Sequence, residues 1–332
     1  MMGTSREFNL GVMFRREHPP EVLPDFARRA EDAGFDELWV VEDCFYTSGI
    51  AQAATALACT GSITVGLGIM PAVARNPVFT AMEIATLAGL YPGRFLPGLG
   101  HGVAGWMRQI GAFPRSQLVA LEETTIAVRG LLAGERLSFE GSQVHLKDAQ
   151  LVHPPDEVPP ISLGVRGPKS LALSGRVADG TILGEFSAPD YVSWAVEQIA
   201  AGQREAGRDS APGAHRLTVF AFTCVDSPPY SARRQLRPLV AAAIESDRKQ
   251  AHFAPLDIGQ EAQDVLEQGG RERLEAEMPD AWINQLCIVG TPEECAAAVR
   301  RLVDAGAGSV VLVPLPDKGI DELDVLARVF LS

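Results

Sequence analysis

The sequence predicts an α/β protein, a (β/α)8 TIM barrel, and three observations lead to this fold class. Eight short apolar runs of strand type alternate with segments of helical periodicity along the 332 residues. No linker rich in Pro and Ser divides the chain, so we expect one domain over 1–332. The alternative, a doubly wound open sheet, is disfavoured because no G-x-G-x-x-G follows the first predicted strand.

The first half of the chain supplies four strands, each followed by a helix. In the helix over 20–33 the apolar side chains share one face, and Gly34 follows as a C-terminal cap. The predicted elements, strand and helix in turn, are 8–14, 20–33, 37–41, 50–59, 63–69, 78–90, 94–99 and 117–132.

The second half supplies four more strands and two insertions. The predicted strands are 160–164, 180–183, 217–225 and 309–313, with helices between or after them. The best-marked helix begins with a capping box at Thr291-Pro292-Glu293-Glu294 and ends at Gly306. Residues 135–155 alternate around Gly141 like an inserted hairpin, and residues 233–284 are too long for one loop and predict added helices before the eighth strand.

Charge and hydropathy exclude two classes of partner. The chain has 29 Lys and Arg against 42 Asp and Glu, a formal net charge of −13, and shows no basic stripe for nucleic acid. Residues 44–74 carry no charge, but several glycines and Pro71 divide them into a helix, a turn and a strand, so we expect no membrane span. The first residues lack the regions of a signal peptide, and we expect a cytoplasmic protein.

The five cysteines are odd in number and widely spaced. They form no C-x-x-C pair, which argues against a disulfide framework and against a zinc site. We therefore expect no metal site and treat most of these cysteines as small core residues.

Two predicted outer helices, 50–59 and 78–90, almost lack a polar face. The first has no charged residue and the second has only Glu83. An outer helix that is apolar nearly all round must be covered, most economically by the same surface of a second copy. The sequence therefore predicts a homodimer.

Candidate functional residues follow the strands, because barrel chemistry lies at the carboxyl ends of the strands. Glycines dominate these positions, and each lets a backbone approach a ligand closely. The tip of the fifth strand is the strongest phosphate candidate: Gly164, Val165 and Gly167 can present N–H groups at the start of a helix, while Arg166 and Lys169 supply charge. A plain turn that starts the next helix would use the same residues, so both interpretations stay open.

Three side chains are candidates for acid–base chemistry. Glu42 and Asp43 follow the second strand, but adjacent residues at a strand end point to opposite sides, so at most one faces the pocket. A solvated or capping role is the alternative for either. His101 lies between two glycines at the tip of the fourth strand, where a functional role competes with a structural one. No G-x-S-x-G, H-E-x-x-H or P-loop is present, so hydrolase, metalloprotease and kinase functions have no support.

Short motifs extend over nearly the whole chain. They are 30–39, 57–60, 65–69, 75–77, 93–95, 98–100, 159–164, 167–175, 178–180 and 290–293. In this order they resemble the luciferase-like monooxygenase superfamily. The resemblance implies a barrel that binds either FMN or the deazaflavin coenzyme F420.

Within this superfamily, the sequence most resembles the F420-dependent branch, in particular the members that are similar to methylenetetrahydromethanopterin reductase. Gly66-Leu67-Gly68-Ile69 stands where that branch carries a bulge against the ring, with a cis peptide that maps to the bond from Gly68 to Ile69. The resemblance places the ring across the barrel mouth and the phosphate at the tip of the fifth strand. Further cofactor contacts are then expected at Gly100 and Gly184.

Two positions depart from the family. Cys44 stands where many members have His, and Val103 stands where the sugar-oxidising deazaflavin enzymes have a Glu acid. The second departure puts oxidation of glucose 6-phosphate in doubt.

The expected function is an oxidoreductase in which F420 carries hydride to or from a small organic substrate, while the protein positions the ring. The first alternative is an FMN-dependent monooxygenase that uses O2 and takes reduced flavin from a partner reductase. The second alternative is a flavin-binding protein without catalysis.

Overall fold

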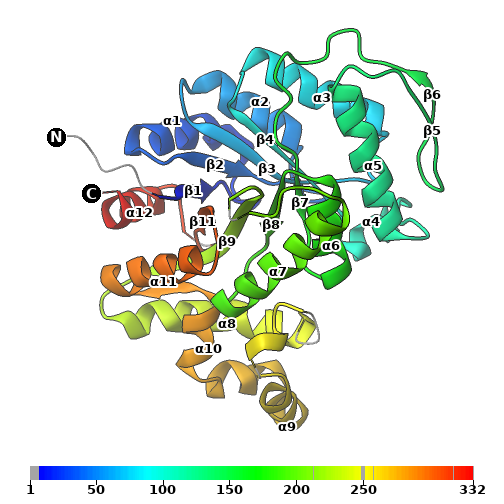
Figure 1. Ribbon diagram of the computed structural model, residues 1–332. Coiled ribbons are helices and arrows are strands. Elements are labelled where there is room, and N and C mark those ends of the chain that lie inside the picture. Colours follow the sequence, from blue (N-terminus) through cyan, green and yellow to red (C-terminus); the bar gives the residue numbers. More distant parts are fainter. Residues whose placement is uncertain (1–6, 212, 248–250, 257, 317, 332) are drawn as a thin grey trace.

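Eight parallel strands close into a barrel in the computed structural model, which describes residues 7–211, 213–247, 251–256, 258–316 and 318–331 (Figure 1). Each strand pairs with the next around the ring, and β9 closes the ring by pairing with both β8 and β11. The barrel strands are β1 (Asn9–Met13), β2 (Glu37–Val40), β3 (Thr64–Pro71), β4 (Phe95–Gly100), β7 (Ser162–Gly164), β8 (Gly180–Leu183), β9 (Arg216–Val225) and β11 (Ser309–Val313). The predicted (β/α)8 barrel is confirmed.

The helices that follow these strands pack around the barrel. They are α1 (Leu23–Ala33), α2 (Gly49–Cys59), α3 (Pro77–Leu90), α4 (Ala104–Gln109), α5 (Gln117–Leu132), α6 (Pro168–Val177), α7 (Pro189–Glu205), α11 (Pro292–Asp304) and α12 (Glu322–Phe330). The sequence predicts α5, β8 and β11 to the residue. The short helix α4 is absent from the prediction because its six residues are too few for a helical period to show.

Local signals in the sequence account for several helix ends. Pro20–Val22 form a 3-10 turn before α1, and Gly34 ends α1 with a φ of 90° that an L side chain rarely adopts. At the start of α11, the Thr291 hydroxyl accepts a hydrogen bond from the Glu294 N–H, and the Glu294 carboxylate accepts one from the Thr291 N–H. The predicted capping box is confirmed.

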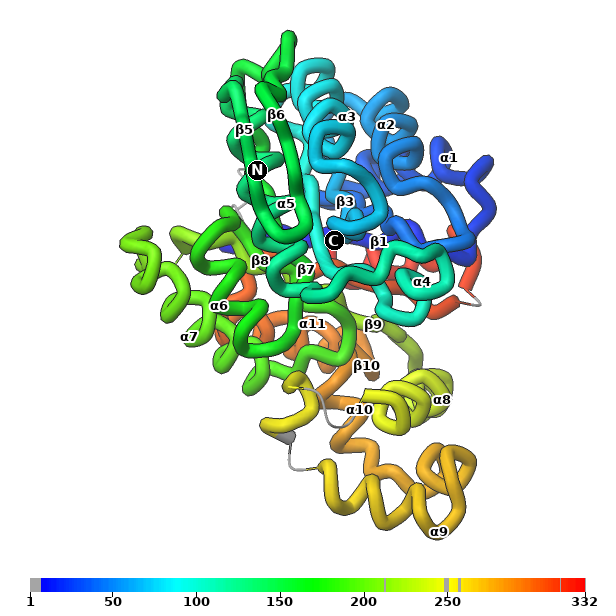
Figure 2. The backbone as a smooth tube through the Cα atoms, turned by 90° about the vertical axis from the view of Figure 1, so that its right-hand side faces the viewer, coloured from blue at the N-terminus to red at the C-terminus, as the bar shows by residue number. Residues whose placement is uncertain are grey.

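Both expected insertions are present, at opposite ends of the molecule (Figure 2). The strands β5 (Leu137–Glu140) and β6 (His145–Ala149) form an antiparallel hairpin. Glu123 of α5 fastens the hairpin, because its carboxylate accepts hydrogen bonds from the N–H groups of Ser142, Gln143 and Val144. The added helices before the last strand are α8 (Pro229–Asp247), the 3-10 turn η2 (Ala254–Leu256), α9 (Gly259–Glu277) and α10 (Asp280–Leu286).

One strand was not predicted. The strand β10 (Ile288–Gly290) pairs with the carboxyl end of β9, outside the ring of eight. Its three residues follow α10 directly, so no alternation marks them as a strand.

Apolar side chains fill the interior of the barrel, together with the buried carboxylate of Glu37, whose oxygens have hydrogen-bond partners. Trp39 and Phe220 pack edge to face with ring centroids 5.2 Å apart. Near the amino ends of the strands, the buried Glu37 pairs with Arg216 and accepts hydrogen bonds from Trp39 Nε1 and the Ser309 hydroxyl. The barrel is thus a packed core, and ligands are restricted to its mouth.

Three further findings concern the sequence predictions. None of the five cysteines forms a disulfide. Within the described residues, no helix combines the length and apolar character that crossing a membrane requires. The helix α3 exposes Phe79, Met82 and Leu90, which are 60%, 47% and 65% accessible.

Candidate active site

A cavity of about 610 Å3 lies at the carboxyl ends of the strands. This volume falls within the range of sites that bind a cofactor or small molecule, about 300–1,000 Å3. Loops after β1, β2, β4, β7 and β8 surround it, and inward-facing side chains of β9 line it from one side. The site therefore lies where chemistry is found in barrel enzymes.

The floor of the cavity contains a bulge in β3. The register between β3 and β4 shifts between Leu67 and Met70, and the bond from Gly68 to Ile69 is cis, as the family resemblance implied. The Ile69 side chain lies against neighbouring strands: a Cβ on Gly100 would come within 2.9 Å of it, and one on Gly164 within 2.5 Å. These glycines make room for Ile69.

Gly100 was expected to contact the cofactor, and the structure corrects this expectation. Ile69 covers Gly100, which does not line the cavity. A side chain at position 100 would collide with Ile69, which explains why this residue is glycine. The other expected contacts on these strands line the cavity: Gly68, Ile69, Gly164 and Gly184.

The loop from β7 to α6 forms one end of the cavity. Val165, Arg166, Gly167 and Ser170 line it, and Gly167 is the N-cap of α6. The first turn of a helix leaves N–H groups without intrahelical partners, which favours an anion there. A Cβ on Gly167 would meet nothing within 4 Å, so the space beside it is open to a ligand.

Arg166 supplies the positive charge at this end. Its guanidinium lies across Gly184, where a Cβ would come within 2.7 Å of Nη2, and donates to the backbone carbonyl of Glu185 at 3.5 Å. The Arg166 carbonyl accepts a hydrogen bond from the Tyr191 hydroxyl at 2.7 Å, which fixes the loop from behind. Lys169 departs from the expectation, because it is exposed and does not line the cavity.

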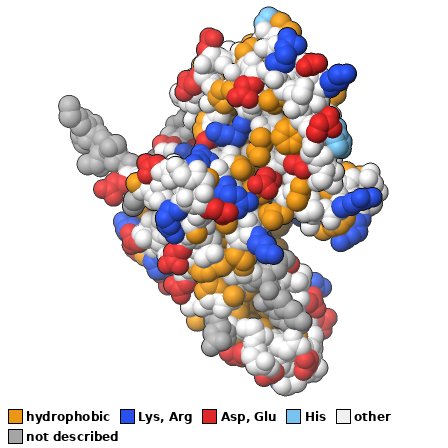
Figure 3. Space-filling view, turned by 45° about the vertical axis from the view of Figure 1, so that its right-hand side comes forward, with side chains coloured by type: hydrophobic (Ala, Val, Ile, Leu, Met, Phe, Trp, Pro, Cys, Tyr) orange, Lys and Arg blue, Asp and Glu red, His pale blue; other side chains and the backbone are white. Residues whose placement is uncertain are grey.

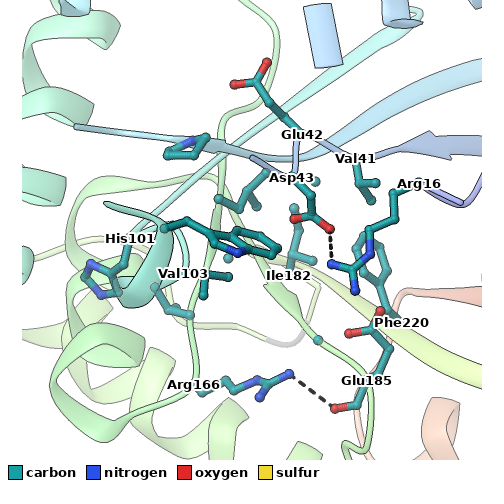
Figure 4. A pocket seen from close by; sticks show the side chains of 18 of the residues that line it. Arg16, Val41, Glu42, Asp43, His101, Val103, Arg166, Ile182, Glu185 and Phe220 are labelled. Atoms are coloured by element: carbon teal, nitrogen blue, oxygen red, sulfur yellow. Dashed lines mark hydrogen bonds and ion pairs between the residues drawn. The ribbon is translucent and has the colours of Figure 1, made fainter. Parts of the chain in front are cut away.

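The adjacent carboxylates Glu42 and Asp43 point in opposite directions (Figure 4). Glu42 accepts two hydrogen bonds from Arg75, at 2.7 and 3.0 Å, and one from the Gly49 N–H at 3.0 Å. Glu42 lines the cavity, but both of its carboxylate oxygens are engaged by these partners, which argues against a role for Glu42 as an acid or base. Asp43 faces the cavity and pairs with Arg16 at 2.7 Å.

His101 connects two loops of the mouth. Its Nε2 lies 3.0 Å from the Ser170 hydroxyl, so the loop after β4 is joined to the first turn of α6. Burial lowers the pKa of His101. The neutral ring predominates at pH 7, and the geometry favours a positioning role for His101 toward the anion end of the cavity.

Several cavity residues were not among the sequence candidates. Arg15, Arg16 and Glu17 follow β1 directly, and the rule that collected the other strand tips would have found them. Phe220 and Phe222 alternate in β9, and this period of two marks them as inward-facing. Trp106 comes from α4, which has no sequence signal of its own.

Charge is mixed on one face of the molecule. Figure 3 shows hydrophobic, basic and acidic side chains interspersed over the described residues of this face.

Comparison with known proteins places this geometry in a family. Residues 4–309 match the luciferase-like monooxygenase family. A 5,10-methylenetetrahydromethanopterin reductase from Methanolobus tindarius is 30% identical over 312 residues, 91% of this chain and 92% of its own length. An F420-dependent glucose-6-phosphate dehydrogenase from Kineococcus radiotolerans is 28% identical and covers 86% of this chain and 85% of its own.

Solved structures share the fold. The F420-dependent tetrahydromethanopterin reductase of Methanopyrus kandleri superposes with a TM-score of 0.81 at 20% identity, over 98% of this chain and 99% of its own. A monooxygenase from Streptomyces bottropensis superposes with a TM-score of 0.73 at 17% identity, over 97% and 98%. These relatives are named as reductases, dehydrogenases and monooxygenases, in agreement with the predicted oxidoreductase class. The chain belongs to the luciferase-like monooxygenase family.

Proposed function

We propose that this protein is an F420-dependent oxidoreductase that moves hydride to or from a small organic substrate. The cavity carries the proposal, because it joins an apolar floor around Ile69 to an anion site at the start of α6. A tricyclic ring with a phosphate-bearing side chain needs both features. The similarity to an F420-dependent dehydrogenase, over 86% of this chain, supports F420 over FMN.

The residues of this chain would hold the cofactor in two places. Ile69 and Ile182 present apolar surface to the ring, and the N–H groups of the first turn of α6, with Arg166 and Ser170, bind the phosphate. His101 holds the Ser170 hydroxyl in this position. Bound F420 supplies a carbon that gives or takes a hydride.

Asp43 is the residue that can handle the accompanying proton. Arg16 holds its Oδ2, and within the described part of the chain no residue hydrogen-bonds its Oδ1. If the substrate is an alcohol, Asp43 Oδ1 would accept its hydroxyl proton, and F420 held by the residues named above would supply the hydride acceptor. In the reverse direction the same oxygen returns the proton.

A titration of the apoprotein under anaerobic conditions tests the cofactor. We expect F420 to bind at least ten times more tightly than FMN, as measured by equilibrium dialysis. Preferential FMN binding, with O2 consumption when a reductase supplies reduced flavin, would instead identify an FMN-dependent monooxygenase. Tight binding of either cofactor with no turnover of any substrate would identify a flavin-binding protein without catalysis.

A further inference from the structure

We infer that the substrate is an uncharged molecule with a flat apolar body and one hydrogen-bond donor, and that anionic substrates are rejected. This inference rests on the proposed function, because it concerns the part of the cavity that the cofactor leaves open. The observations come from five residues that line the mouth, Arg16, Asp43, Val103, Trp106 and Phe222, which we call the arginine–aromatic wall. Figure 4 shows Arg16 and Asp43 of this wall on the opposite side of the cavity from Arg166.

Both cations near the wall are already paired. Arg15 donates two hydrogen bonds to the Glu17 carboxylate, each at 3.0 Å. Arg16 donates to Asp43 at 2.7 Å and to Glu17 at 3.2 Å. A phosphate or carboxylate on the substrate would have to displace one of these carboxylates to gain a charged partner.

Aromatic rings cover the faces of the same two guanidinium groups. The Arg16 guanidinium carbon lies 5.0 Å from the ring centre of Tyr46 and 5.7 Å from that of Trp106. The Arg15 guanidinium carbon lies 5.2 Å from the ring centre of Phe222. These contacts hold each cation in place by cation–π attraction, so the arginines have little freedom to turn toward a new anion.

The balance of charge also opposes an anion. The two arginines after β1 are matched by Glu17 and Asp43, and Glu185 adds a further carboxylate to the lining of the cavity. Arg166 lies at the end assigned to the cofactor phosphate. When the cofactor phosphate occupies that end, an anionic substrate would meet a wall without net charge and one additional carboxylate. The site therefore disfavours anionic substrates.

The uncharged part of the wall is apolar and accessible. Val103 is 51% exposed although it lines the cavity, and the ring of Trp106 lines it beside Val103. Exposed apolar surface inside a concave site favours a ligand that covers it, and an indole face favours a flat one. Asp43 Oδ1, the oxygen that Arg16 leaves open, then supplies the acceptor within the wall for a hydroxyl or N–H of the substrate.

Three probes that share one ring system test the inference. They are 2-naphthylmethanol, its methyl ether, which lacks the donor, and 2-naphthoate, which is anionic. Isothermal titration calorimetry would measure binding to the apoprotein and to the protein loaded with F420 or with FMN. We expect the alcohol to bind at least tenfold more tightly than 2-naphthoate and at least threefold more tightly than the ether.

Variants of the wall sharpen the test. Asp43→Asn leaves Arg16 with Glu17 as its remaining carboxylate partner and removes one negative charge from the wall, so it should strengthen 2-naphthoate binding at least tenfold. Trp106→Ala should weaken all three probes at least tenfold. Ile110→Ala is the matched control, because Ile110 is exposed just beyond α4, does not line the cavity, and should change nothing.

Equal affinity of the wild-type protein for the alcohol and 2-naphthoate would overturn the inference, as would an Asp43→Asn variant with unchanged 2-naphthoate binding. A different result would refute the proposed function. Failure of F420 to bind, with the preference for the alcohol intact, would refute the cofactor and leave the inference standing. Tight F420 binding without a preference for the alcohol would support the cofactor and overturn the inference.

Discussion

Neighbouring residues at the end of β2 serve different purposes because their side chains leave the strand on opposite sides. Glu42 fixes the loop by accepting from Arg75 and from the Gly49 N–H, and Asp43 faces the cavity with one oxygen held by Arg16. A single ion pair of this kind orients a carboxylate without consuming both of its oxygens. Two neighbouring carboxylates therefore meet different surroundings: Glu42 holds a loop in place, and Asp43 keeps one oxygen open to the cavity.

Gly167 provides a direct test of the anion site. A Cβ there would meet no protein atom within 4 Å, and its φ of −82° suits any residue, so Gly167→Val should leave folding intact. The added methyl groups should block close approach of a phosphate to the α6 N-terminus and weaken F420 binding at least tenfold in equilibrium dialysis. Gly61→Val, at another glycine with open space around its Cβ, is the control. An unchanged affinity of Gly167→Val for F420 would show that the phosphate binds elsewhere.

His252 should make stability depend on pH. It is fully buried, neither ring nitrogen has a hydrogen-bond partner among the residues that the structure describes, and burial lowers its pKa to about 3. Because the unfolded chain binds this proton near pH 6.5, the stability due to the neutral ring is complete above pH 6.5 and is lost as the pH falls toward 3, by about 1.4 kcal/mol for each pH unit.

The expected difference is measured by urea unfolding at pH 7 and pH 5. Between these values His252→Leu should lose about 2 kcal/mol less stability than the wild type, because it removes the group that must take up a proton on unfolding. The exposed His153 provides the control variant His153→Leu. Parallel losses in the wild type and His252→Leu would show that His252 does not carry this dependence.

At the scale of elements, the start of α11 shows how a cap connects the barrel to an insertion. Glu294 closes the capping box with Thr291, and its second oxygen accepts from Arg233 of α8 at 2.9 Å. One carboxylate therefore satisfies a helix terminus and joins α8 to α11. The added helices are attached to the barrel at this point by polar contacts as well as by packing.

Thr291→Ala should lower the free energy of unfolding by about 1 kcal/mol, because the Glu294 N–H loses its acceptor. Thr291→Ser keeps the hydroxyl and should restore most of the loss, as judged by chemical denaturation. Equal stability of the alanine and serine variants would mean that the cap contributes nothing measurable.

At the scale of the molecule, α3 offers the surface for a second copy. Its outward side chains Phe79, Met82 and Leu90 are exposed, whereas Ala81 and Ala85 are buried against the barrel. We propose that this face is covered in a homodimer, because an exposed apolar face of this kind is costly in water.

Sedimentation should therefore give about twice the chain mass of 35.5 kDa. Phe79→Arg should shift the protein to the monomer without unfolding it, because the new charge points outward and the core is untouched. Thr86→Arg, at another outward position of α3, should have a similar or weaker effect. A wild-type protein that sediments as a monomer at micromolar concentration contradicts the dimer.

The sequence by itself determined the order of strands and helices, the capping box of α11, the two insertions and the tips at which a site could form. These are local properties: hydrophobic period, glycine and proline at element ends, and hydroxyl caps are all readable within a few residues. The family resemblance added the β3 bulge at Gly68 and Ile69, which the structure contains.

Only the tertiary structure decided which of those residues meet in the cavity. Glu42, Gly100 and Lys169 looked equivalent to their neighbours in sequence, but Arg75 engages the first, Ile69 covers the second, and the third faces solvent. Arg16, in the loop after β1, and Trp106, in α4, come together although they are far apart in the chain. Their contact depends on barrel closure, which brings distant strand ends to one mouth and which no local pattern encodes.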